Sequence, residues 1–64
     1  MKKKSLTVLR EERHLTQEKL AKKVGVTVRT IRTWESDREF LRNAKVKNVV
    51  KLCKVLKIDI NELV

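Results

Sequence analysis

The stretch LTQEKLAKKVGVTVRTIRTWE, residues 15–35, decides how this chain folds. It contains Gly25, the only glycine of a 64-residue chain that has no proline. Gly25 directly follows Val24, at the place where a helix ends in a left-handed residue, a conformation that glycine adopts without a steric penalty from Cβ. We therefore predict a sharp turn at Gly25 between two helices.

Both predicted helices have a start signal. Thr16 and Thr27 are good N-caps, because a threonine hydroxyl can accept a hydrogen bond from an unpaired amide of the first turn. At each start, one apolar residue before the cap and one at the fourth helical position have the spacing of a hydrophobic staple. These pairs are Leu15 with Leu20, and Val26 with Ile31. A helix-turn-helix is predicted over about residues 16–36.

The remaining chain is also predicted to be helical. A first helix covers about residues 5–13, a basic loop covers residues 36–45, and a fourth helix covers about residues 43–56. Asp59, followed three residues later by Glu62, has the spacing of a capping box for a last short helix. The sequence thus predicts a compact all-α domain of five helices that takes up residues 1–64.

The charge of the chain indicates a polyanionic partner. The sequence has 17 Lys and Arg against 8 Asp and Glu, which gives a net charge of +9. Such an excess on a small domain favours DNA, RNA or an acidic membrane surface, and the alternative is a merely solubilising surface. No segment approaches the roughly 20 apolar residues of a membrane span, so a membrane role is not expected.

The predicted helix from Val28 to Ser36 has two different faces. Ile31 and Trp34 point toward the core on a helical wheel. The other face carries no acidic residue and consists of Val28, Arg29, Arg32 and Thr33. A solvated face would be expected to carry mixed charges, so this composition favours a nucleic-acid contact.

These features together resemble the helix-turn-helix domain of the phage lambda repressor and Cro type, the XRE family. The resemblance covers about residues 5–63. The positions that carry it are Gln17, Leu20, Ala21, Gly25, Val26, Ile31 and Glu35, together with the closing segment LCKVLKIDINEL, residues 52–63. It implies a lambda-repressor-like fold of five helices, with the third helix in the major groove and a homodimer on a palindromic operator.

The chain departs from the family pattern in its second half. Asp37 and Lys57 stand where the family often has glycine, and the loop at residues 36–45 looks longer than is common. We therefore expect the turn after the third helix to be built differently.

The resemblance and the residue chemistry assign two sets of DNA contacts. Val28, Arg29, Arg32 and Thr33 are expected to read bases, because arginine can bind guanine O6 and N7 in a bidentate manner. The alternative is that both arginines contact phosphates only. The DNA backbone is expected to meet Gln17, Thr27, Arg10, Arg38, Arg42, Lys45 and Lys47. The lysines of residues 1–4 are either a mobile basic arm over the DNA or a disordered start.

Other residues are expected to have structural roles. The resemblance implies an ion pair between Arg10 and Glu35 that orients Arg10 and fixes the third helix. Size and family suggest a dimer interface at Ile60, Leu63 and Val64. Cys53 is expected to be a buried small residue, since free cysteine is among the most buried residue types.

The sequence therefore predicts a cytoplasmic, sequence-specific regulator of transcription, a repressor, that binds double-stranded DNA as a homodimer. The alternative is an antitoxin-like or adaptor protein that uses the same scaffold to bind another protein, and such a partner is also a possible means of regulation. No nucleophile–base pair, glycine-rich phosphate loop or metal-ligand spacing is present, so we expect no enzyme activity, cofactor, metal or small-molecule ligand.

Overall fold

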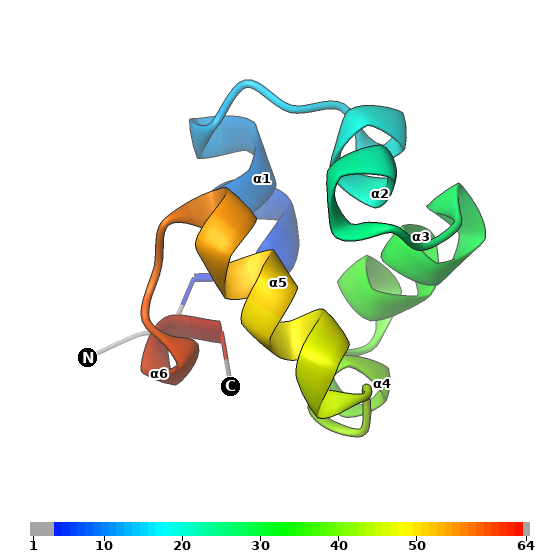
Figure 1. Ribbon diagram of the computed structural model, residues 1–64, viewed down its shortest axis with the longest axis vertical. Helices are drawn as coiled ribbons and strands as arrows, with labels where there is room; N and C mark the ends of the chain where they lie inside the picture. The colour runs from blue at the N-terminus through cyan, green and yellow to red at the C-terminus, as the bar shows by residue number, and fades with distance from the viewer. Residues whose placement is uncertain (1–3, 64) are drawn as a thin grey trace.

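A computed structural model of the chain describes residues 4–63 (Figure 1). Residues 1–3 of the predicted basic arm and Val64 of the predicted dimer contact lie outside these residues. The elements are α1 (Leu6–Glu12), α2 (Gln17–Val24), α3 (Val28–Ser36), α4 (Arg38–Arg42), α5 (Val46–Leu56) and α6 (Ile60–Leu63). The all-α class is confirmed, but the described residues form six helices rather than five.

The helix-turn-helix is built as its sequence predicts. The Thr16 hydroxyl accepts from the amide of Lys19 at 3.1 Å, and the Thr27 hydroxyl accepts from that of Thr30 at 3.2 Å. Gly25 adopts the left-handed conformation with φ of 87°. The amides of Gly25 and Val26 both donate to the carbonyl of Ala21, which satisfies an acceptor that the end of α2 would otherwise leave free.

The extra helix, α4, lies in the segment that was expected to be a loop. Asp37 is extended, with φ of −145°, and its carboxylate accepts from the amide of Glu39 at 2.9 Å. Asp37 thus ends α3 and caps α4 without needing the left-handed backbone of a glycine. Leu41 fixes α4 to the core and is 2% exposed. As a result, α5 begins at Val46 instead of near Asn43.

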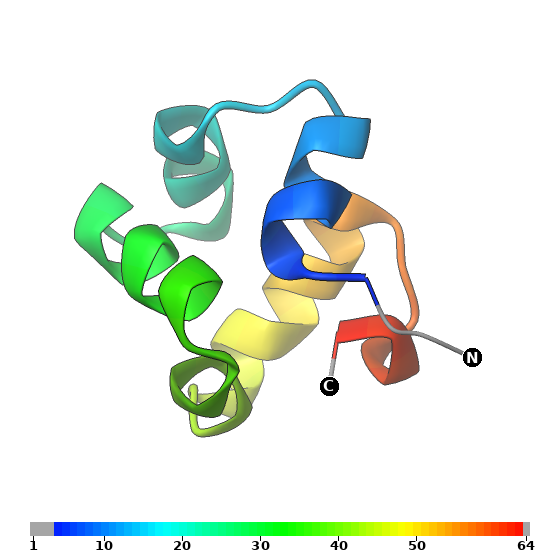
Figure 2. The ribbon, with the colours of Figure 1, turned by 180° about the vertical axis from the view of Figure 1, so that it is seen from behind.

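The core lies between α5 on one side of the molecule and α1 with α3 on the other (Figures 1 and 2). Trp34 is 6% exposed and belongs to this core, as expected. Cys53 is half-buried, which corrects the expectation that it is buried. Leu63, which was expected at a subunit interface, is 1% exposed within its own chain. Its side chain has no surface left to offer a partner.

No helix formed by residues 4–63 has the length and apolar character that crossing a membrane requires.

Candidate nucleic-acid interface

The outer face of α3 presents its two arginines to solvent. Arg29 and Arg32 are exposed, whereas Val28 and Thr33 are half-buried. Val28 also packs against the core, and the Thr33 hydroxyl donates to the carbonyl of Arg29 at 3.0 Å. The two arginines are therefore the long, charged groups that project from this face. Val28 and Thr33 lie lower on the same face.

Behind this face lies a carboxylate that joins three helices. Glu35, near the end of α3, is 7% exposed and accepts a hydrogen bond from Arg10 Nε of α1 at 2.6 Å. It also accepts from the Thr7 hydroxyl of α1 at 3.0 Å and from Gln17 Nε2 of α2 at 2.9 Å. The ion pair between Arg10 and Glu35 is thus present, as the resemblance implies.

Arg10 is almost fully used by the fold. Its side chain is 12% exposed, and Nη1 donates to the carbonyl of Leu15 at 2.7 Å while Nε and Nη2 face Glu35. The guanidinium therefore ties the end of α1 to the loop before α2 and to α3. This geometry favours a structural role for Arg10, in which it holds α2 and α3 in place. It does not favour the expected contact of Arg10 with a phosphate.

The ionised form of Glu35 is stabilised. Burial alone would raise the pKa of this carboxyl, but the hydrogen bonds from Arg10, Gln17 and Thr7, together with the charge of Arg10, outweigh burial. The pKa of Glu35 consequently lies below its ordinary value. At neutral pH the carboxylate is a permanent acceptor at the back of α3.

This acceptor orients Gln17, and Gln17 in turn contacts Arg32. Because the carboxylate can only accept, the amide nitrogen of Gln17 faces Glu35 and the amide oxygen faces outward. That oxygen accepts from Arg32 Nε at 3.3 Å. Sequence reasoning missed this contact, since the two residues are 15 positions apart and only the angle between α2 and α3 brings them together.

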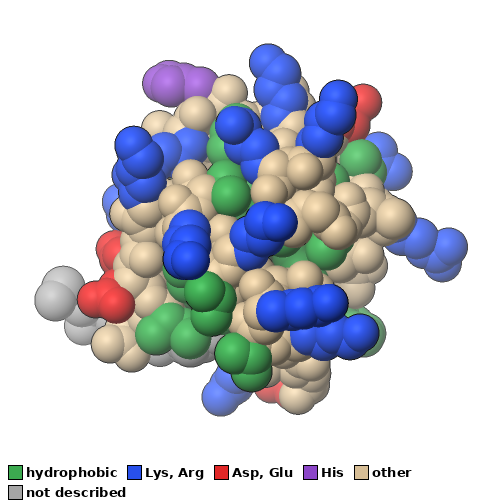
Figure 3. All heavy atoms as spheres, viewed as in Figure 1, with side chains coloured by type: hydrophobic (Ala, Val, Ile, Leu, Met, Phe, Trp, Pro, Cys, Tyr) green, Lys and Arg blue, Asp and Glu red, His purple; other side chains and the backbone are tan. Residues whose placement is uncertain are grey.

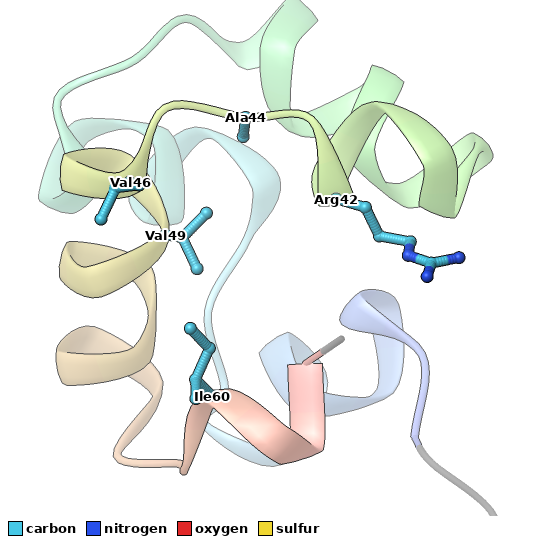
Figure 4. A pocket seen from close by; sticks show the side chains of 5 residues that line it. All are labelled: Arg42, Ala44, Val46, Val49 and Ile60. Atoms are coloured by element: carbon cyan, nitrogen blue, oxygen red, sulfur yellow. The ribbon is translucent and has the colours of Figure 1, made fainter.

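The other cations expected at the DNA backbone fall into two groups. Lys45 is the N-cap residue of α5, and Lys47 lies in its first turn and shares a shallow hollow with Gly25. Arg38 instead donates to the carbonyl of Lys4, just before α1, at 3.4 Å. Arg42 pairs with Glu39 at 3.3 Å and borders a hollow between α4, α5 and α6 (Figure 4). Of these four cations, Lys47 is the one that borders the turn of the helix-turn-helix.

Thr27 combines two contacts within its own turn. Its hydroxyl caps α3 and also lies 3.0 Å from the hydroxyl of Thr30. Thr27 remains exposed, so its oxygen is open to one further hydrogen bond.

A comparison with protein families found a match to a family model described as helix-turn-helix, over residues 8–63. The match contains α2 and α3 and almost all of the rest of the chain. Searches of curated proteins and of solved structures found no match.

Proposed function

The chain belongs to the helix-turn-helix family of the Cro/C1 type, a family of DNA-binding regulators, and we propose that it is a sequence-specific repressor that binds a palindromic operator as a homodimer. The observation that carries this proposal is the outer face of α3, which presents two exposed arginines and no acid. A protein of this kind acts where the DNA is, in the cytoplasm.

Arg32 is proposed as the better-prepared reader of bases. Its Nε is engaged by Gln17, so the two terminal nitrogens of the guanidinium remain available at the end of the side chain. Those nitrogens form the fork that binds guanine O6 and N7 in a bidentate manner. Among residues 4–63, the Arg29 guanidinium has no hydrogen bond to another side chain. We therefore propose that Arg29 takes up its base-contacting conformation only when the protein has bound the duplex.

Residues beside the outer face of α3 are proposed to contact the DNA backbone. Lys45 and Lys47 lie at the start of α5, where unpaired amides and the positive end of the helix dipole also attract phosphate. Gln17 and Thr27 each retain hydrogen-bonding capacity beside α3. Arg38 and Arg42 would reach a phosphate only after leaving the partners described above.

A second copy of the chain is proposed to cover the apolar side of α5 and α6. Val46, Val50 and Ile60 are 77%, 42% and 47% exposed, a large apolar area for one side of a small domain. Val46, Val49 and Ile60 line the hollow bordered by Arg42, as Figure 4 shows. The proposed interface therefore keeps Ile60 from the sequence-based prediction. It includes Val46 and Val50 and leaves out Leu63.

Selection of bound duplexes from a random pool tests this function. We expect enriched sites with two inverted half-sites whose centres lie about one helical turn apart. Arg32→Ala should relax the preference at one position of each half-site by roughly 1–3 kcal/mol. Binding to random duplexes should change much less.

An unenriched pool would contradict a sequence-specific function. If Arg32→Ala weakened specific and random binding equally, Arg32 would be a phosphate contact. Arg29→Ala is the matched comparison, because it removes the same side chain from the same face without disturbing Gln17.

The same apolar side of α5 and α6 favours the alternative, an adaptor or antitoxin-like protein, if its partner is a different protein. A chain that selects no DNA site and sediments as a monomer would support this alternative.

A further inference from the structure

A row of three exposed lysines runs along α5, apart from the outer face of α3. Lys47, Lys51 and Lys54 are spaced four and three residues apart, so they lie on one side of the helix. We call these three residues the lysine row. The core side of α5 is formed by Val49, Leu52 and Leu56. The lysine row is therefore not a by-product of core packing.

No ion pair among residues 4–63 includes a lysine of the row, although Asp59 shares a hollow with Lys54 at its far end. The sequence has no acidic residue between Phe40 and Ile58. The ion pairs found among residues 4–63 join Lys4 to Glu12, Arg10 to Glu35 and Arg42 to Glu39, and none includes the row. Lysines four residues apart on a helix repel each other and weaken it. An anionic partner would relieve that repulsion.

The positive surface extends beyond the row at both ends. Lys47 and Lys51 share a shallow hollow with Val24 and Gly25, in the turn that leads into α3. Past the other end, Lys57 shares a second hollow with Lys23 and Arg13. Lysine and arginine side chains are spread over the face that α5 crosses, and the acidic side chains in this view lie at its edge (Figure 3).

We propose that the lysine row binds phosphates of duplex DNA, as a sequence-independent contact in addition to α3. This inference rests on the proposed function. Duplex DNA is favoured over an acidic protein because the row begins beside the turn at Gly25 that leads into α3, the helix that the proposed function places on DNA. The row is about 10 Å long at 1.5 Å per residue. A duplex presents one phosphate charge per about 1.7 Å of its axis, so several phosphates lie within that length.

The test is the salt dependence of binding to a random-sequence duplex. The slope of log K against log salt is negative, and each phosphate contact that is lost should reduce its magnitude by about 0.9. Lys51→Gln/Lys54→Gln should therefore reduce the magnitude of the slope by about 1.8 relative to the unmodified chain. Lys19→Gln/Lys22→Gln, on α2, is the matched control because it removes the same charge from exposed lysines. Its slope should change by less than half as much.

Equal slopes for the lysine-row variant and the unmodified chain would overturn the proposal. Equal decreases in both double variants would also overturn it, because net charge rather than position would then explain the effect. A row variant that loses binding to an acidic polypeptide but keeps its DNA slope would assign the row to a protein partner instead.

Two further experiments identify which phosphates the lysine row binds. If the row holds the flanks of the duplex read by α3, lengthening a selected site with random flanks should raise the affinity of the unmodified chain and not of the row variant. If it holds a second duplex, the unmodified chain should bridge two labelled duplexes and the row variant should not. Absence of both effects would overturn the proposal. Failure of the proposed function is separable, because it would appear as a chain that selects no site whatever its salt slope.

Discussion

Removing one partner of the buried pair Arg10–Glu35 should cost more stability than removing both. The two side chains are 12% and 7% exposed and their closest atoms are 2.6 Å apart. Arg10→Met or Glu35→Leu alone leaves an unpaired charge, at a cost of about 3–5 kcal/mol. The free energy of unfolding of a 64-residue domain is only roughly 3–10 kcal/mol, so each single variant should lose a large share of its stability.

The double variant Arg10→Met/Glu35→Leu removes both charges and keeps comparable volume. Thr7 and Gln17 lose their acceptor, but both are half-exposed and can bond to water. We therefore expect a cost of about 1–2 kcal/mol for the double variant, and a coupling energy of at least about 3 kcal/mol between the two sites. Urea unfolding followed by the fluorescence of Trp34 measures all four proteins, since Trp34 is the only tryptophan and is buried. If the two single costs added to the cost of the double variant within about 0.5 kcal/mol, Arg10 and Glu35 would not stabilise each other.

The pH dependence of unfolding gives an independent check on the same pair. Because the pKa of Glu35 is lowered by folding, its stabilising effect is complete above the ordinary glutamate value of 4.5 and is lost as the pH falls through the lowered pKa. The unmodified chain should therefore lose stability in this acidic range more steeply than the double variant. Identical acid profiles would show that Glu35 is not the group responsible.

The double variant also tests whether the pair serves DNA binding. Without Glu35, nothing fixes the direction of the Gln17 amide, and Arg32 loses its fixed acceptor. We expect the preference for a selected site over random duplex to fall by about 1 kcal/mol, roughly fivefold, in a protein that still folds. An unchanged preference would show that the hydrogen bonds around Glu35 serve stability only.

Three further predictions concern the backbone and the subunit contact. Lys57 is left-handed, with φ of 55°, so Lys57→Gly should raise the free energy of unfolding by up to about 1 kcal/mol in urea titrations. Gly25→Ala should lower it by about 1–2 kcal/mol although space for Cβ exists, and a gain there would contradict a conformational role for the glycine. Val50→Asp should weaken dimerisation at least about tenfold in sedimentation experiments. The control is Val8→Asp, because Val8 is 41% exposed against 42% for Val50, and equal loss in both variants would exclude this surface.

The parts of the fold that could be predicted are those with local causes. Thr16, Gly25 and Thr27 act on amides and carbonyls within five residues, so their types and spacing are sufficient to locate the ends of α2 and α3. The capping box is a similar case, since the amide of Asp59 donates to Glu62 at 2.9 Å. Signals of this kind do not depend on where the rest of the chain lies.

The parts that could not be predicted depend on tertiary packing. α4 has five residues and buries only Leu41, which is too short for an apolar period to appear in its sequence. Leu63 follows a helix start that was identified correctly, but the direction in which α6 turns against α5 decides that it is buried. The resemblance supplied the pair Arg10–Glu35, whereas nothing in the sequence indicated that Gln17 would connect this pair to Arg32.

That connection limits how the recognition surface can vary. Glu35 holds α1 and α2 against α3 through Thr7, Arg10 and Gln17, so it contributes to the stability of the whole helix-turn-helix. The same carboxylate determines which end of the Gln17 amide faces outward, and hence whether an arginine or an acceptor side chain is favoured at position 32. Arg32→Glu should therefore place two acceptors against each other and lose the contact with Gln17, whereas Arg29→Glu should leave that contact intact. If the two changes had equal effects on stability, the amide of Gln17 would not be fixed by Glu35.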